Sequence, residues 1–236
     1  MSRAALRTIA FGDAEGQLWG AAVGAEACVA AFGGTATGAA AATGALRLMT
    51  ENHVWRLWGD GVQLDVVPRE PPGDGAAGGL ELCDVRGTLT VSGEQRSIDC
   101  PGARCQVTDP PADGPLSARG VAGFFDDEAV SLLALRSGVA HHDADRVSAR
   151  LFDADAWLTV DDPRLSTTYA DDGTPQRASL ELWVNDGEHE FPRRAAGEAD
   201  GPAVTAHADG VRLSVIPLRC HSRGHEGAGV YLLATF

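Results

Sequence analysis

The chain has 236 residues, 44% of them apolar, and its 33 acidic against 19 basic residues give a formal net charge of −14. That length can bury a sizeable core, as one large all-β domain or two small ones. The negative charge argues against nucleic acid or an anionic membrane as a partner. No apolar run reaches the roughly 18 residues of a membrane span. The chain has no lysine, which excludes lysine Schiff bases and lysine general bases.

The N-terminal residues predict a cytoplasmic protein. Residues 1–7 lack the apolar run of a secretory signal and lead directly into Thr8-Ile9-Ala10-Phe11. An odd number of cysteines, five, favours free thiols in a reducing compartment. Cys100 and Cys105 leave three interpretations open: ordinary strand cysteines, a small disulfide loop, or two metal ligands. Because no second paired motif accompanies them, we expect no metal and no other cofactor.

Alternation of apolar and polar residues between Gly- and Asp-rich turns predicts antiparallel hairpins along the chain. We expect small-residue strands and turns over 27–46, then a hairpin of 54–58 with 62–68 across Asp60-Gly61. Three further hairpins are expected. The first spans 80–91 and closes at 92–94, the second pairs 178–184 with 188–191, and the third pairs 210–218 with the last strand, 224–236. Residues 126–137 have helix propensity, but the surrounding hairpins favour a strand there.

Pro- and Gly-rich breaks divide the chain. The first lies at 71–75 and the second at 109–115, close to the middle of the sequence. We therefore predict an N-terminal β-unit over 1–108, a linker over 109–118 and a C-terminal β-unit over 119–236, packed together. The pattern predicts no oligomeric state.

Four stretches of the second half carry a resemblance. They are residues 162–169, residues 176–183, residues 191–198, and the closing Gly-x-x-Gly-x-Gly-x-Tyr of 224–231. Together they resemble a broad lipocalin-like superfamily that includes carotenoid 1,2-hydratases and tocopherol-cyclase-like proteins. The resemblance implies tandem antiparallel β-barrels that hold long apolar molecules. It covers about 119–236. The His-Ser-Trp-Gly-type segment of the family's enzymes is replaced here by 100–107, which has neither His nor Trp, so the resemblance implies fold and ligand class rather than activity.

Several polar and aromatic residues are candidates for a site. His221, His225 and Glu226 in the closing hairpin suit acid–base catalysis or form a polar rim of a barrel. Arg193 and Arg194 suit a ligand carboxylate or phosphate, or pair with Glu190 or Glu198. Trp55 and Trp183 are expected to be core anchors or pocket walls. The segment 141–145, His-His-Asp-Ala-Asp, has metal-capable side chains but also reads as a solvated turn.

These observations predict a β-barrel protein that binds a small apolar molecule, such as a lipid or isoprenoid, in its cavity, and they demonstrate no catalysis. One alternative is a hydratase or cyclase that acts on an isoprenoid or polyketide-like substrate through His221, His225, Glu226 and Asp143. A second alternative is a structural or interaction module with a packed interior. The ligand itself is not predicted.

Overall fold

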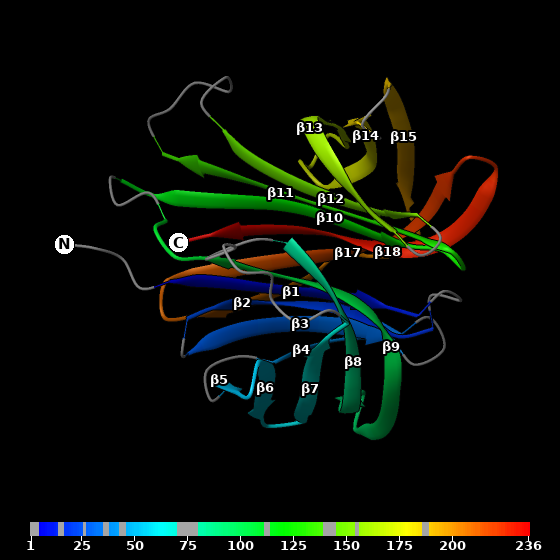
Figure 1. Ribbon diagram of the computed structural model, residues 1–236. Coiled ribbons are helices and arrows are strands. Elements are labelled where there is room, and N and C mark those ends of the chain that lie inside the picture. The colour runs from blue at the N-terminus through cyan, green and yellow to red at the C-terminus, as the bar shows by residue number, and fades with distance from the viewer. Residues whose placement is uncertain are drawn as a thin grey trace.

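The computed structural model describes residues 5–13, 17–25, 27–34, 38–42, 46–69, 80–110, 114–138, 145–153, 156–185 and 189–236. The described residues form strands and turns and contain no helix, so none of them forms a helix that could cross a membrane. The strands make two antiparallel sheets of nine strands each, one above the other in Figure 1. The all-β prediction is confirmed.

The first sheet is an open half-barrel, here called the N-terminal half-barrel. Its first and last strands, β1 and β9, pair with each other, and its free edges are β4 and β5. A bridge joins Ala27, just before the third strand, to Arg47 on the β5 edge, so the two ends of the sheet approach there. Its strands are β1 (Leu6–Gly12), β2 (Trp19–Gly24), β3 (Cys28–Gly34), β4 (Gly38–Ala42), β5 (Arg47–Glu51), β6 (Val54–Gly59), β7 (Val62–Pro68), β8 (Leu80–Val91) and β9 (Glu94–Val107).

The second sheet curls into a nearly closed barrel, here called the C-terminal barrel. Its first and last strands, β10 and β18, also pair, and β15 pairs with β17 to bring the sheet round on itself. Its strands are β10 (Leu116–Phe124), β11 (Glu128–Ser137), β12 (Arg146–Asp153), β13 (Ala156–Tyr169), β14 (Pro175–Asn185), β15 (Glu190–Ala199), β16 (Val204–Ala208), β17 (Val211–Ser222) and β18 (His225–Thr235).

Alternation along each strand sends side chains to opposite faces, and both faces of the central strands are buried. On β1, Ile9 and Phe11 enter the core of the half-barrel, whereas Leu6 and Ala10 enter a core shared with the second sheet. On β18, Tyr231 faces the inside of the C-terminal barrel, and its neighbours face the shared core. Three apolar clusters result: one inside each sheet and one between them.

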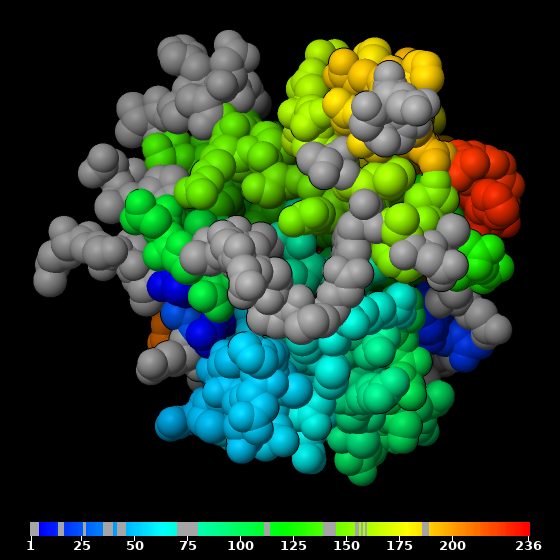
Figure 2. Space-filling model, in the orientation of Figure 1, coloured from blue at the N-terminus to red at the C-terminus, as the bar shows by residue number. Residues whose placement is uncertain are grey.

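The shared core joins the two halves. Strands β1, β2 and β3 contact β16, β17 and β18 across it, and these strands lie together at the centre of Figure 1. Many of its residues are alanines, including Ala21, Ala31, Ala118 and Ala234, which let the two sheets approach closely. Figure 2 shows the same arrangement from outside, with the blue-to-green first half below the green-to-red second half.

Most of the expected elements appear where the sequence places them. Residues 128–137 are a strand, β11, because pairing with β10 and β12 overrides their helix propensity. The hairpins β6–β7 and β17–β18 match the predicted ones. Residues 80–91 form a single strand, β8, whose hairpin partner is β9. The connection between the two sheets runs from Val107 to Leu116, and the break at 71–75 lies outside the described residues.

Candidate functional site

The C-terminal barrel has a seam between β12 and β13. These strands pair only beside their turn, from Asp153 with Ala156 to Leu151 with Leu158. Beyond that point β12 continues along β11 as far as Arg146, and β13 continues along β14 as far as Tyr169. Figure 1 shows the two strands diverging. The remaining lengths of β12 and β13 therefore share no ladder, and we call this interval the β12–β13 seam.

Apolar side chains along the seam face the barrel interior but remain partly exposed. Their cross-strand partners, such as Leu132, Leu180 and Val184, are buried members of the interior core. The half-barrel core is better covered, because among the described residues only Leu18 and Ala40 pack against it as partly buried apolar residues. The inner face of the C-terminal barrel is thus accessible at the seam. The partly exposed residues of this inner face are Val147, Ala149, Leu158, Val160, Leu165, Phe191 and Leu233.

An ion cluster lies at one end of the seam. The Asp145 carboxylate accepts hydrogen bonds from Arg119 Nη2 at 2.8 Å and from Arg136 Nε at 2.6 Å and Nη2 at 2.8 Å. The Arg136 hydrogen bonds outweigh the opposing effect of burial and, with Arg119, lower the pKa of Asp145. One carboxylate faces two guanidinium groups, so this part of the cluster carries a net positive charge.

Both tyrosines of the chain meet beside this ion cluster. Tyr231 on β18 is completely buried, and its hydroxyl lies 3.2 Å from Thr167 Oγ1. Tyr169 at the end of β13 is 46% exposed, and its hydroxyl interacts with Tyr231 and Arg119. We call Arg119, Arg136, Asp145, Thr167, Tyr169 and Tyr231 the tyrosine cluster.

The two hydroxyls differ in acidity because their surroundings differ. Burial raises the pKa of Tyr231 to about 12. Burial also opposes ionisation of Tyr169, but hydrogen bonds with Tyr231 and Arg119 outweigh it and lower the pKa of Tyr169. An exposed phenol with a stabilised anion can give up a proton and take it back. Tyrosine is among the side chains that act in this way in general acid–base catalysis.

Four of the predicted residues lie on the outside of the C-terminal barrel. His221 and Arg194 line one groove of about 510 Å³ on the outer face of β13–β15 and β17. Glu226 lies 3.9 Å from His221 Nδ1, and Arg194 donates to Glu181 at 3.1 Å. His225 is exposed beside the closing turn, opposite Ser222. None of these residues contacts the tyrosine cluster, and a catalytic role for them stays a prediction.

Arg193 points into the C-terminal barrel, at the end opposite the tyrosine cluster. Its guanidinium pairs with Asp153 and lies 5.5 Å from the centroid of the Phe191 ring. The Asp153 carboxylate also pairs with Arg223, at 3.1 Å. Among the described residues Arg193 Nε is a buried donor without a partner. This spare donor is compatible with the predicted binding of a ligand anion, which stays a prediction.

The two candidate tryptophans have different surroundings. Trp55 is packed inside the half-barrel, and the guanidinium groups of Arg104 and Arg7 lie 4.7 and 5.6 Å from the centroid of its ring. Arg104 is itself buried and pairs with Glu81 at 2.7 Å. Trp183 lies half-buried on β14, on the face opposite Leu182 and Val184, and its Nε1 donates to Glu181 at 3.3 Å. Their role as pocket walls stays a prediction.

The cysteines are five buried free thiols. Cys100 faces the half-barrel core, and Cys105 faces the shared core, on the other side of β9. Burial raises the pKa of both thiols to about 12, so they are unreactive near neutral pH. His141, His142 and Asp143 lie outside the described residues, within which no group of three metal-capable side chains is present.

The tyrosine cluster is not among the sites predicted from the sequence. Tyr169 and Tyr231 end two of the stretches that carry the family resemblance, and they are the only tyrosines in the chain. The rarity of tyrosine could therefore have drawn attention to these two residues. Their proximity could not be predicted from the sequence, because it depends on the pairing of β18 with both β17 and β10 and on the end of β13 lying at the open seam.

Comparisons with known proteins establish the fold. No protein-family model and no curated protein matches the sequence. Among solved structures, CghA with Sch210972 matches with a TM-score of 0.62 at 10% identity, over 98% of this chain and 88% of that one. Kievitone hydratase from Nectria haematococca matches with a TM-score of 0.57 at 11% identity, over the same shares of the two chains. The chain therefore has the lipocalin-like tandem-barrel fold that was predicted.

Proposed function

We propose that this protein is an acid–base enzyme of the hydratase or cyclase type that acts on a small apolar substrate. The observation that carries the proposal is the pairing of the exposed Tyr169 with the buried Tyr231 and Arg119 at the open seam. The partly exposed apolar inner face beside it suits an isoprenoid- or polyketide-like substrate. Its fold neighbour kievitone hydratase, which is named as a hydratase, supports this reaction class.

In a hydration, the Tyr169 hydroxyl gives its proton to one carbon of a substrate double bond. Arg119 and Tyr231 stabilise the phenolate that remains, through their hydrogen bonds to its oxygen. Water then bonds to the neighbouring carbon and returns one proton to Tyr169. In a cyclisation, a new carbon–carbon bond forms instead, and Tyr169 takes its proton from another substrate carbon. Tyr169 is the catalytic residue, and Tyr231 and Arg119 are positioning residues.

The test uses the full-length protein and an apolar extract of its host in ¹⁸O-labelled water. Hydration predicts a product that gains the mass of one labelled water, whereas cyclisation predicts a product of unchanged mass. Tyr169→Phe should slow product formation by about 10²–10⁴-fold, the usual contribution of a general acid or base. Met49→Leu, at an exposed residue of the half-barrel, is the control. An unchanged rate in Tyr169→Phe would refute the proposal.

Tyr231→Phe and Arg119→Gln test the positioning roles. Both variants lose a hydrogen bond that stabilises the Tyr169 phenolate, so both should move the pH profile of product formation toward higher pH. A purely structural role would lower the amount of folded enzyme without moving the profile.

A second candidate is a carrier that binds an apolar ligand without turnover, as the half-exposed inner face also supports. Native mass spectrometry of the protein purified from its host separates the two. The carrier is favoured if an apolar molecule co-purifies with the protein and is released from it chemically unchanged, and if the Tyr169→Phe variant binds the same amount of it. For either function the five buried thiols support a reducing, cytoplasmic location.

A further inference from the structure

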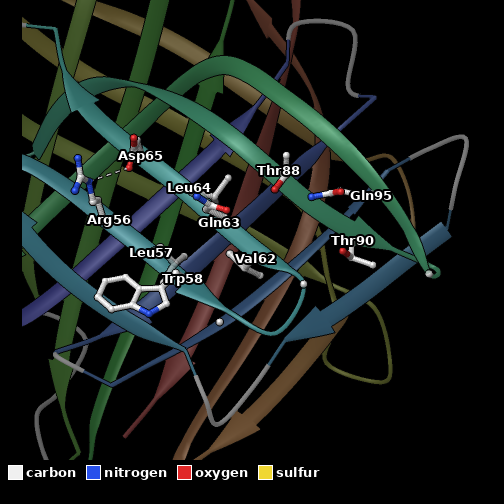
Figure 3. Close-up of a pocket in the computed structure, with 13 residues that line it drawn as sticks. Arg56, Leu57, Trp58, Val62, Gln63, Leu64, Asp65, Thr88, Thr90 and Gln95 are labelled. Atoms are coloured by element: carbon white, nitrogen blue, oxygen red, sulfur yellow. Dashed lines mark ion pairs between the residues drawn. The ribbon is translucent and has the colours of Figure 1, made fainter.

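A second concave site lies far from the seam, on the outer face of the N-terminal half-barrel. It is a cleft of about 820 Å³ over strands β6 to β9 (Figure 3). Cross-strand pairing places Trp58 beside Gln63 and Gln63 beside Thr88, and Figure 3 shows Gln63 between the other two. Thr90 and Gln95 form a second pair at the same end of the sheet. We call this site the outer cleft.

The outer cleft presents polar groups that are free to bind. The side chains of Gln63, Thr88, Thr90 and Gln95 make no hydrogen bond with the part of the chain that the structure describes. Amide and hydroxyl groups both donate and accept hydrogen bonds. A ligand that matches these side chains must therefore carry several groups that both donate and accept hydrogen bonds.

Charge and aromatic surface narrow the ligand class further. Arg56 is the cation of the outer cleft, and it is held at 3.3 Å from Asp65 and 2.6 Å from Glu51, so little free charge faces a ligand. Trp58, half-buried at one side, offers a flat apolar ring next to these polar groups.

We propose that the outer cleft binds a neutral polyhydroxylated ring, that is, a sugar. The hydroxyls of a sugar ring both donate and accept, and its C–H face is flat and apolar enough to stack on Trp58. The cleft volume lies within the range of about 300–1,000 Å³ that small-molecule sites occupy. The sugar is either a free oligosaccharide or a glycosyl group on a larger molecule, and both have this chemistry.

The test is a glycan array of neutral and acidic oligosaccharides probed with the full-length protein. We expect neutral glycans to bind, and titration calorimetry with the best-bound one, as free sugar, to give its affinity. Trp58→Ala should weaken that affinity by about ten-fold, from the lost stacking. Gln63→Ala should also weaken it. Trp183→Ala, which removes a half-buried tryptophan from the other half of the molecule, should leave it unchanged.

Several outcomes would overturn the proposal: no array member binds, only acidic glycans bind, or Trp58→Ala and Trp183→Ala lose affinity equally. Binding of linked glycans but not of the free sugar supports the site and identifies a glycosylated molecule as its source. Circular dichroism of each variant checks its folding. The Tyr169→Phe variant should bind the glycan normally, so failure of this proposal and failure of the proposed enzyme function are distinguishable.

Discussion

At the scale of single residues, the two tyrosine hydroxyls differ in their access to water. Tyr231 has no exposed surface and Tyr169 is nearly half exposed, yet they share one hydrogen-bond network. Because the chain holds only these two tyrosines, any tyrosine titration of the protein reports on this site alone.

We predict a split tyrosine titration in the near-ultraviolet absorbance of the folded protein. One step should occur below the ordinary value for tyrosine, about 10, because hydrogen bonds lower the pKa of Tyr169. The other should occur near pH 12, because burial raises the pKa of Tyr231. Tyr169→Phe should remove the lower step, and Arg119→Gln should move it to higher pH. A single step for both groups near pH 10 would contradict this picture.

At the scale of elements, β18 holds the C-terminal barrel together by pairing with both β10 and β17. Its glycines make that position possible. A Cβ at Gly229 would meet the Ala122 carbonyl oxygen and would lie 2.8 Å from Cys220 Sγ. The Gly-x-Gly of the closing run is thus a packing requirement between three strands rather than part of a phosphate-binding loop.

Gly229→Ala should therefore destabilise the protein by about 1–3 kcal/mol, the usual cost of overpacking a core. Urea unfolding monitored by circular dichroism measures it. Gly12→Ala is a matched control on β1, because the nearest atoms to its Cβ, on Trp19 and Leu18, lie at 3.8 and 3.9 Å, which is ordinary contact. That variant should change the unfolding free energy by less than about 0.5 kcal/mol. Equal effects of the two variants would refute the packing argument.

At the scale of the whole molecule, local patterns predicted the strands but not how the sheets close. Alternation and the Asp60-Gly61 turn were enough for the β6–β7 hairpin, and the sheet context was enough to identify β11. The meeting of Tyr169 with Tyr231 depends on the pairing of β18 with β10, whose residues lie far apart in the sequence, and no local pattern encodes it. The β12–β13 seam has a different origin: the two strands are neighbours in the sequence, but they pair only beside their turn. Likewise, no local pattern around Trp55 indicated that the guanidinium groups of two arginines would lie over its ring.

The shared core also leads to an expectation for how the molecule unfolds. The Phe124 ring of β10 reaches 3.9 Å from the position that a Cβ on Gly12 of β1 would occupy, so side chains of both halves interlock there. Separating the halves would expose this whole apolar cluster to water, at a cost that grows with its area. We therefore expect the two β-units to unfold together, in one cooperative transition.

Leu57→Ala tests this expectation, because Leu57 is buried only in the half-barrel core. The substitution should cost about 2–5 kcal/mol. If the halves unfold together, native-state hydrogen exchange of the most protected amides should accelerate by the same factor in β6 and β7 as in β14 and β15. Phe124→Ala, in the shared core, should act on both halves in the same way. Acceleration confined to the first half in Leu57→Ala would show instead that each unit unfolds independently and that the shared core contributes little to cooperativity.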